Sequence, residues 1–230
     1  MRATILAAAV LLLLACGGGK PAPAAKTDNY FPMANGYDWK YTSTEVSYLD
    51  SVRAETTADA GSLEYRCVGR KPMPNGREAW ALHRHIRYYT KTAQARAAKD
   101  TVMWVTDTIF ADQADSLVLY WATRNFDRPN VDLALPLRAG RTWDVLAGKN
   151  YTSRATAVRQ EPVKVPAGEY AQAWRIEILT TPADGKMPPM RAVRWYAAGV
   201  GLVRTETEVI RSNGTLLRTV EELVSAKTGK

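Results

Sequence analysis

Residues 201–210, GLVRTETEVI, decide the fold class of this chain. Arg204, Glu206 and Glu208 alternate with Thr and Val, which predicts a β-strand with one face in water. Asn213-Gly214 follows closely and has the chemistry of a tight hairpin turn, because both residue types tolerate a positive φ. The stretch therefore predicts antiparallel pairing with the next segment, residues 215–224.

The same pattern of short strands and turns extends back to residue 39. Segments rich in Val, Thr, Tyr and Ile predict strands at residues 39–49, 78–91, 101–110, 116–121, 151–159, 161–165, 170–180 and 190–197. Turn residues separate several of them, at 74–76, 166–168 and 184–185. Only residues 92–99 have a helical composition. The expected fold is all-β, an antiparallel meander or a curved or sandwiched sheet.

One nine-residue pattern occurs twice. Residues 31–39, FPMANGYDW, and 135–143, LPLRAGRTW, share apolar-Pro-apolar-x-x-Gly-x-x-Trp. Pro restricts the backbone, Gly permits a tight turn and Trp fills the core at a strand start. Two further tryptophans follow each copy, namely Trp80 and Trp104, then Trp174 and Trp195. The pattern predicts two repeated halves, 30–130 and 131–226, or two strand starts that converged on one turn.

The first 15 residues have the layout of an export signal, with Arg2 before an apolar run too short to span a bilayer. Residues 13–16, LLAC, resemble the lipobox of bacterial lipoproteins, which implies a signal peptide at 1–15 and a diacylglyceryl (palmitate-type) lipid on Cys16. Residues 16–29 are rich in Gly, Pro and Ala and predict a flexible tether, followed by a β-rich domain at 30–230. By resemblance to Gram-negative lipoproteins, Gly17 favours the outer membrane, facing the periplasm. An ordinary secretory signal is the alternative.

Composition limits the class of partner. The 230 residues carry a formal net charge of +8, spread in ones and twos, which predicts a mildly basic solvated surface or attraction to anionic envelope polymers. Nucleic acid is a poor partner for an exported protein.

Once Cys16 is acylated, Cys67 has no disulfide partner. The alternation in residues 63–67 places Cys67 on the buried face of a strand, as an inert thiol.

Two further motifs lie near the C-terminus, at residues 163–170, VKVPAGEY, and 195–204, WYAAGVGLVR. Together with residues 31–39, they resemble uncharacterised bacterial envelope lipoproteins that begin with a Pro-Leu-x-x-Gly-x-x-Trp turn and end with Tyr-x-x-Gly-Val-Gly. This chain has Met33 in place of the usual Leu and Ala198 where Pro is common. The resemblance implies a β-rich fold and assigns no activity. Gly199-Val200-Gly201 predicts a hairpin or bulge, because a strand follows it and no helix does.

Catalytic and metal-binding signals are weak. His83 and His85 would share one strand face about 7 Å apart, but a zinc site needs at least one further ligand and Arg87 would oppose a cation there. The further ligand could come from Asp107, Asp112 or Asp115, but nothing in their spacing selects one of them. We find no nucleophile elbow and no zinc-protease helix motif. The sequence therefore predicts a non-enzyme without a cofactor.

Seven Trp and eleven Tyr stand against three Phe, a bias toward aromatic side chains with a polar group. The candidate binding residues are the adjacent pairs Tyr88, Tyr89 and Tyr120, Trp121, because one ring of each pair should face away from the core. The expected function is a membrane-anchored envelope lipoprotein with a binding or scaffolding domain for an apolar ligand, an envelope polymer or a protein. A periplasmic carrier of lipid, with a deep apolar cavity, is the alternative. The second alternative is a hydrolase with two acidic side chains close to each other.

Overall fold

The computed structural model describes residues 29–49, 54–89, 102–121, 126–147, 150–185 and 188–227. Within these ranges no helix is long and apolar enough to cross a lipid bilayer. The described chain forms twelve strands, β1 (Asp38–Leu49), β2 (Ala54–Pro72), β3 (Glu78–Tyr89), β4 (Val102–Ala114), β5 (Leu117–Trp121), β6 (Asn130–Ala134), β7 (Thr142–Ala147), β8 (Tyr151–Val165), β9 (Gly168–Pro182), β10 (Met190–Ala197), β11 (Gly201–Ile210) and β12 (Leu216–Lys227).

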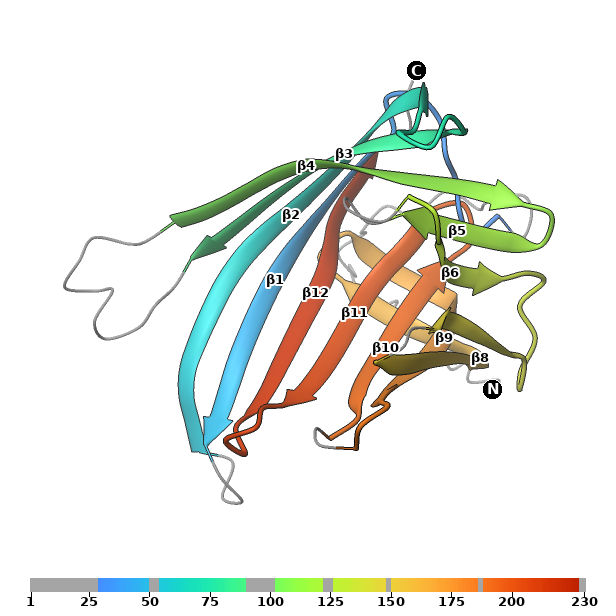
Figure 1. The fold of residues 1–230 in the computed structure, drawn as a ribbon. Helices are drawn as coiled ribbons and strands as arrows, with labels where there is room; N and C mark the ends of the chain where they lie inside the picture. The colour runs from blue at the N-terminus through green and yellow to red at the C-terminus, as the bar shows by residue number, and fades with distance from the viewer. Residues whose placement is uncertain are drawn as a thin grey trace, which may run out of the picture.

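The strands belong to one antiparallel sheet in the order β6-β5-β4-β3-β2-β1-β12-β11-β10-β9-β8-β7. Each strand pairs with the next along the chain except β6 with β7, and β1 pairs with β12 at the centre. The sheet curls until it is nearly closed into a barrel, so that β6 and β7 lie next to each other (Figure 1). The expected all-β meander is therefore confirmed.

A single indole group links the two edge strands. Trp143 in β7 donates its Nε1 hydrogen to the carbonyl oxygen of Val131 in β6 at 3.2 Å, and the Trp143 side chain is buried. Among the described residues, no ladder of backbone hydrogen bonds pairs β6 with β7. Exposed strand edges attract other chains, and here the two edges lie against each other.

Most of the expected strands are present, with differences in extent. Residues 151–159 and 161–165 form one continuous strand, β8, because register shifts after Ala157 and Glu161 absorb the irregular residues between them. β2 is far longer than the 63–67 segment expected from alternation, and β6 was not expected. The Asn213-Gly214 hairpin joins β11 to β12 as expected, with Gly214 at φ 82°. Residues 92–99, with their helical composition, lie outside the described residues.

The two copies of the repeated pattern fold into turns with the same hydrogen bonds. The Gly36 N–H donates to Cys67 O, and the Cys67 N–H donates to the carbonyl of the residue after Gly36. Gly140 and Ala157 form the equivalent bonds, and the two glycines have φ 78° and 81°. Such positive φ values favour glycine. The shared geometry explains the shared sequence, and the two-half organisation stays a prediction.

The register limits how far that similarity extends. The second tryptophan of each set has the same position relative to its turn. Trp80 lies two residues before Leu82, which pairs with Cys67, and Trp174 lies two residues before the residue that pairs with Ala157. The third pair of tryptophans does not correspond in this way. Trp195 is one residue before the partner of Trp174 in β10, whereas the matching position in β4 is Phe110, not Trp104.

Hydrophobic side chains pack on both faces of the sheet. Leu82, Ile109 and other inward residues form the interior, together with Cys67, which is 0% exposed as the alternation predicted. Burial raises the pKa of the Cys67 thiol, which keeps it protonated and unreactive. A smaller cluster lies on the outer face of β3, β4 and β5, namely Met73, Ala79, Ala81, Phe110, Leu119 and Trp121, with Phe126 packed against it.

Candidate ligand cavity

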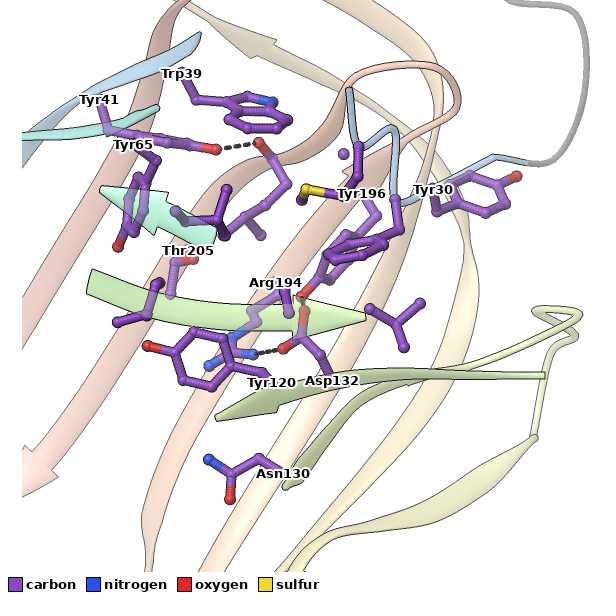
Figure 2. Close-up of a pocket in the computed structure, with 18 of the residues that line it drawn as sticks. Tyr30, Trp39, Tyr41, Tyr65, Tyr120, Asn130, Asp132, Arg194, Tyr196 and Thr205 are labelled. Atoms are coloured by element: carbon purple, nitrogen blue, oxygen red, sulfur yellow. Dashed lines mark hydrogen bonds and ion pairs between the residues drawn. The ribbon is translucent and has the colours of Figure 1, made fainter. Parts of the chain in front are cut away.

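A cavity of 410 Å³ lies inside the curl of the sheet. Its lining comes from β1 to β7 on one side and from β10 to β12 on the other, together with the segment that precedes β1. Leu82, Ile109 and Val118 form an apolar part of the wall, while Arg84 and Arg194 bring charge into it. Figure 2 shows the aromatic and polar side chains converging on this space. The cavity is thus amphipathic.

The segment just before β1 forms one wall of the cavity. Tyr30 is 4% exposed, and Phe31, Pro32 and Met33 line the same space. The Gly199 N–H donates to the carbonyl of Asn29 at 2.7 Å. This bond holds the start of the domain against the β10–β11 turn.

Three aromatic side chains at the start of the domain bind that turn. Tyr37 and Tyr41 donate their hydroxyl hydrogens to Gly199 O and Leu202 O at 3.0 and 2.9 Å, and Trp39 Nε1 donates to the intervening Val200 O at 2.8 Å. Gly201 has φ 93°, and a Cβ atom added to it would lie 3.5–3.9 Å from atoms of Pro32, Tyr30 and Trp39. The hairpin or bulge predicted for Gly199-Val200-Gly201 is present as the antiparallel β10–β11 turn, and its glycines let the segment before β1 approach this turn closely.

A hydrogen-bonded triad of Asp132, Arg194 and Tyr196 crosses the interior from β6 to β10. These two strands are not neighbours in the sheet. Asp132 accepts hydrogen bonds from Arg194 Nη1 at 2.5 Å and from the Tyr196 hydroxyl at 2.9 Å (Figure 2). Burial raises the pKa of the Tyr196 phenol well above its ordinary value, so the hydroxyl stays protonated and donates. Both carboxylate oxygens of Asp132 are therefore engaged by the protein itself.

A second ion pair lies on the adjacent wall. Arg84 in β3 donates from Nε to Asp107 Oδ1 at 2.8 Å and from Nη2 to Asp107 Oδ2. The bidentate geometry orients the guanidinium plane. Tyr65 and Tyr120 line the cavity beside this pair, and burial is the main cause that raises the pKa of each phenol. Both tyrosines are neutral hydrogen-bonding groups at neutral pH.

The last charged group in the wall is Glu221 of β12. In the register of the sheet it stands between Ser43 of β1 and Thr205 of β11. Burial raises the pKa of its carboxyl, and the charges of Arg194 and Arg84 oppose that rise. Within the described part of the chain, neither a hydrogen bond nor an ion pair engages the Glu221 carboxylate. It differs in this from Asp107 and Asp132.

The expected aromatic binding residues have different positions. Tyr120 faces inward and lines the cavity. Trp121 faces the opposite side of the sheet as expected, but it is 1% exposed within the outer cluster, so it offers no exposed ring. Tyr88 and Tyr89 pair with Gly61 and Ala60 through their backbones, and their side chains lie outside the described residues. Alternation could find Tyr120, but it could not tell a cavity from an outer surface.

The remaining candidates lie away from the cavity. His83 and His85 alternate with Leu82 and Arg84, which line the cavity, and therefore face outward. His85 Nδ1 is 2.9 Å from Thr106 Oγ1. No group of three or more metal-ligating side chains occurs among the residues that the structure describes. Cys16 and its tether lie outside the described residues.

Comparisons with known proteins find similar solved structures. No protein-family profile and no curated protein matches the sequence. One similar solved structure is a "putative exported protein with YmcC-like fold" from Bacteroides fragilis, 14% identical, covering 86% of this chain and 99% of that chain with a TM-score of 0.49. Another is a "putative lipoprotein" from Parabacteroides distasonis, 16% identical, covering 86% and 98% with a TM-score of 0.45. Nothing about ligand or activity follows from either likeness.

Proposed function

We propose that this chain is a bacterial envelope lipoprotein whose β domain binds a small ligand inside its curled sheet without converting it. The observation that supports this is the cavity of 410 Å³ with its mixed lining. Ligand sites in proteins typically have about 300–1,000 Å³ and combine apolar walls with a few placed polar groups. A domain that acted only as a scaffold would have no need of charged side chains in its interior, where their desolvation is costly.

Binding is favoured over hydrolysis by the state of the acids. Asp107 and Asp132 each accept hydrogen bonds at both carboxylate oxygens from side chains of the protein, so neither presents a free oxygen to a reacting bond. General acid–base catalysis by a carboxyl pair needs two acids with separated pKa values close to one reacting bond. Among the described acids that line the cavity, only Glu221 lacks a bound arginine. A carrier of apolar molecules is the second candidate, supported by the Leu82, Ile109 and Val118 wall.

The proposed anchor places the cavity near a membrane. Twelve residues lie between Cys16 and Asn29, and such a tether spans at most about 45 Å when fully extended. The wall formed by Tyr30 and Phe31 follows the tether directly. A ligand could therefore pass between the cavity and the outer-membrane surface, facing the periplasm, without a second attachment site.

Replacing Cys16 by Ser tests the anchor. We expect the wild-type chain to incorporate radiolabelled palmitate and to partition into the detergent phase of a Triton X-114 separation, and Cys16→Ser to lose both properties, because serine has no thiol to acylate. The matched control is Cys67→Ala, which removes the other cysteine and should keep the label. Unchanged labelling of Cys16→Ser would contradict the lipoprotein assignment.

Filling the cavity tests the binding function. All twelve strands and their core clusters lie between Asn29 and Lys227, so the domain can be produced from Gly17 onward without the lipidated cysteine. We expect the neutral fluorophore N-phenyl-1-naphthylamine to bind this protein, and Thr207→Trp to weaken binding at least tenfold, because Thr207 lines the cavity. Fluorescence titration measures both.

The control for that experiment is Thr44→Trp, which introduces the same ring at an exposed position of β1. It should bind the fluorophore as the wild type does. Thermal unfolding followed by circular dichroism checks that both variants fold. If the wild type binds no fluorophore, or if the two variants bind it equally, the cavity is not a ligand site.

A further inference from the structure

The charges that face the interior do not balance. Arg84 is paired with Asp107, and Arg194 is paired with Asp132. Each pair is neutral as a unit, and each carboxylate already has both oxygens engaged. Glu221 is a third acid against two arginines, so the described cavity carries one uncompensated negative charge whenever Glu221 is ionised.

The position of Glu221 suits contact with a ligand. It lines the cavity from β12, and its neighbours across the sheet, Ser43 and Thr205, are buried hydroxyl residues. Arg84 and Arg194 interact with its charge electrostatically without forming an ion pair to it in the described part of the chain. Burying a carboxylate without a partner is costly. A ligand that brings a positive charge would remove that cost.

Aromatic rings surround the same space. Tyr41 and Tyr65 meet edge to face with ring centroids 5.9 Å apart, and Tyr120 lines the cavity beside them. Tyr41, Tyr65 and Glu221 all line this one cavity. Electron-rich ring faces attract ammonium groups, most strongly in partly desolvated sites. A carboxylate among tyrosines is thus chemically complementary to an amine.

We propose that the cavity binds the ammonium head of a small amphipathic molecule, with Glu221 as its counter-ion and the apolar remainder against Leu82, Ile109 and Val118. This inference rests on the proposed binding function and specifies its ligand class. An anionic head would be repelled by the Glu221 carboxylate. Arg194 keeps a buried Nε donor outside its pair, but Asp107 and Asp132 already balance the charges of the two arginines. An anion bound there would therefore add to the excess negative charge of the cavity, which selects against anions.

The test uses three probes with the same eight-carbon chain and different heads, n-octylamine, n-octanoate and n-octanol. Each is titrated at pH 7 against the protein from Gly17 onward, loaded with N-phenyl-1-naphthylamine, and displacement of the fluorophore is measured. We expect octylamine to displace it at a concentration at least tenfold lower than octanoate, with octanol between them. Glu221→Gln should weaken octylamine binding at least tenfold and leave octanol binding unchanged.

The matched control is Glu222→Gln. It removes the same charge from the next residue, on the opposite face of β12, where Glu222 pairs with Arg204, and it should leave octylamine binding unchanged. Glu221→Gln should also fold. Burial raises the pKa of the wild-type Glu221 carboxyl above the ordinary 4.5, so its ionised form destabilises the folded state at higher pH. The neutral amide of the variant should therefore unfold at the same or a higher temperature at pH 7.

The results distinguish a wrong ligand class from a wrong binding function. If octanoate binds as tightly as octylamine, or if Glu221→Gln leaves octylamine binding unchanged, the cationic ligand class is wrong while cavity binding stands. If none of the three probes displaces the fluorophore and the fluorophore itself does not bind, the proposed binding function fails, and the inference fails with it.

Discussion

Trp195→Ala is expected to lower the free energy of unfolding by about 4 kcal/mol, within the range for deletion of a buried tryptophan. The indole of Trp195 is 8% exposed and lies on the sheet face opposite the cavity, between Arg175 and Arg204, whose guanidinium carbons are 5.9 and 5.5 Å from the ring centroid. Its Nε1 donates to Glu161 Oε1 at 2.8 Å. Urea denaturation followed by circular dichroism measures the loss.

The size of this effect follows from the position of Trp195 in a ladder across five strands. Arg204 reaches Glu222 of β12, and Arg175 lies beside both the ring and Glu161 of β8. These pairs are partly exposed, and such ion pairs are individually worth little. The ring provides the apolar surface that aligns them. Its removal leaves a void and separates the charged side chains from one another.

Trp195→Phe separates packing from hydrogen bonding. The phenyl ring keeps most of the contact with both arginines, and the lost indole donor should cost only about 1–2 kcal/mol. Burial opposes ionisation of Glu161, but hydrogen bonds from Trp195 and Arg159 hold its pKa below the ordinary value. That stabilisation is present above the ordinary pKa and is lost on acidification, so the difference between wild type and Trp195→Phe should shrink in acid. Equal losses for Ala and Phe would contradict the packing account.

Asp132→Ala is expected to cost about 3 kcal/mol, because it leaves the Arg194 guanidinium inside the protein without its carboxylate. The Tyr196 hydroxyl loses its acceptor in the same variant. Arg194 and Asp132 retain 31% and 26% side-chain exposure toward the cavity, so water can partly solvate the arginine. For that reason we place the effect at the lower end of the range of about 3–5 kcal/mol for broken buried pairs. Chemical denaturation measures it.

The control is Asp144→Ala. Asp144 of β7 also pairs with an arginine, Arg154, but this arginine lies on the neighbouring strand β8, at 3.6 Å, and the two side chains are 72% and 68% exposed. Exposed pairs of this kind contribute about 0–1 kcal/mol, so Asp144→Ala should be close to wild type. If the two variants lose the same stability, the triad around Asp132 is not a structural link between β6 and β10.

The strands that sequence reasoning found are those whose residues alternate or end in a turn signal. β11 and β12 are such a pair, joined at Asn213-Gly214. β2 contains residues 54–61, AETTADAG, with few residues that favour strands. β1 pairs along this segment and β3 meets its end, so partners distant in sequence determine its conformation. Local propensity could not have predicted that outcome.

The cavity was beyond sequence reasoning for a related reason. Glu221 and Glu222 are adjacent and chemically alike, and alternation shows only that they face opposite sides of β12. Which side becomes the interior depends on the direction in which the whole sheet curls. Tyr120 was a candidate as a surface ring, and the curl places it inside.

The sequence by itself determined the strand periodicity and the glycine turns at Gly36, Gly140 and Gly214, because each depends on neighbouring residues alone. For the same reason it predicts, from a short local pattern, an export signal and acylation at Cys16. The tertiary structure decided that β1 pairs with β12 and that Asp132 meets Arg194 across 62 positions. It also decided that Glu221 faces the cavity without a hydrogen bond or an ion pair in the described part of the chain. These features arise from closure of the sheet, which brings distant strands together and makes one of two chemically similar faces the interior.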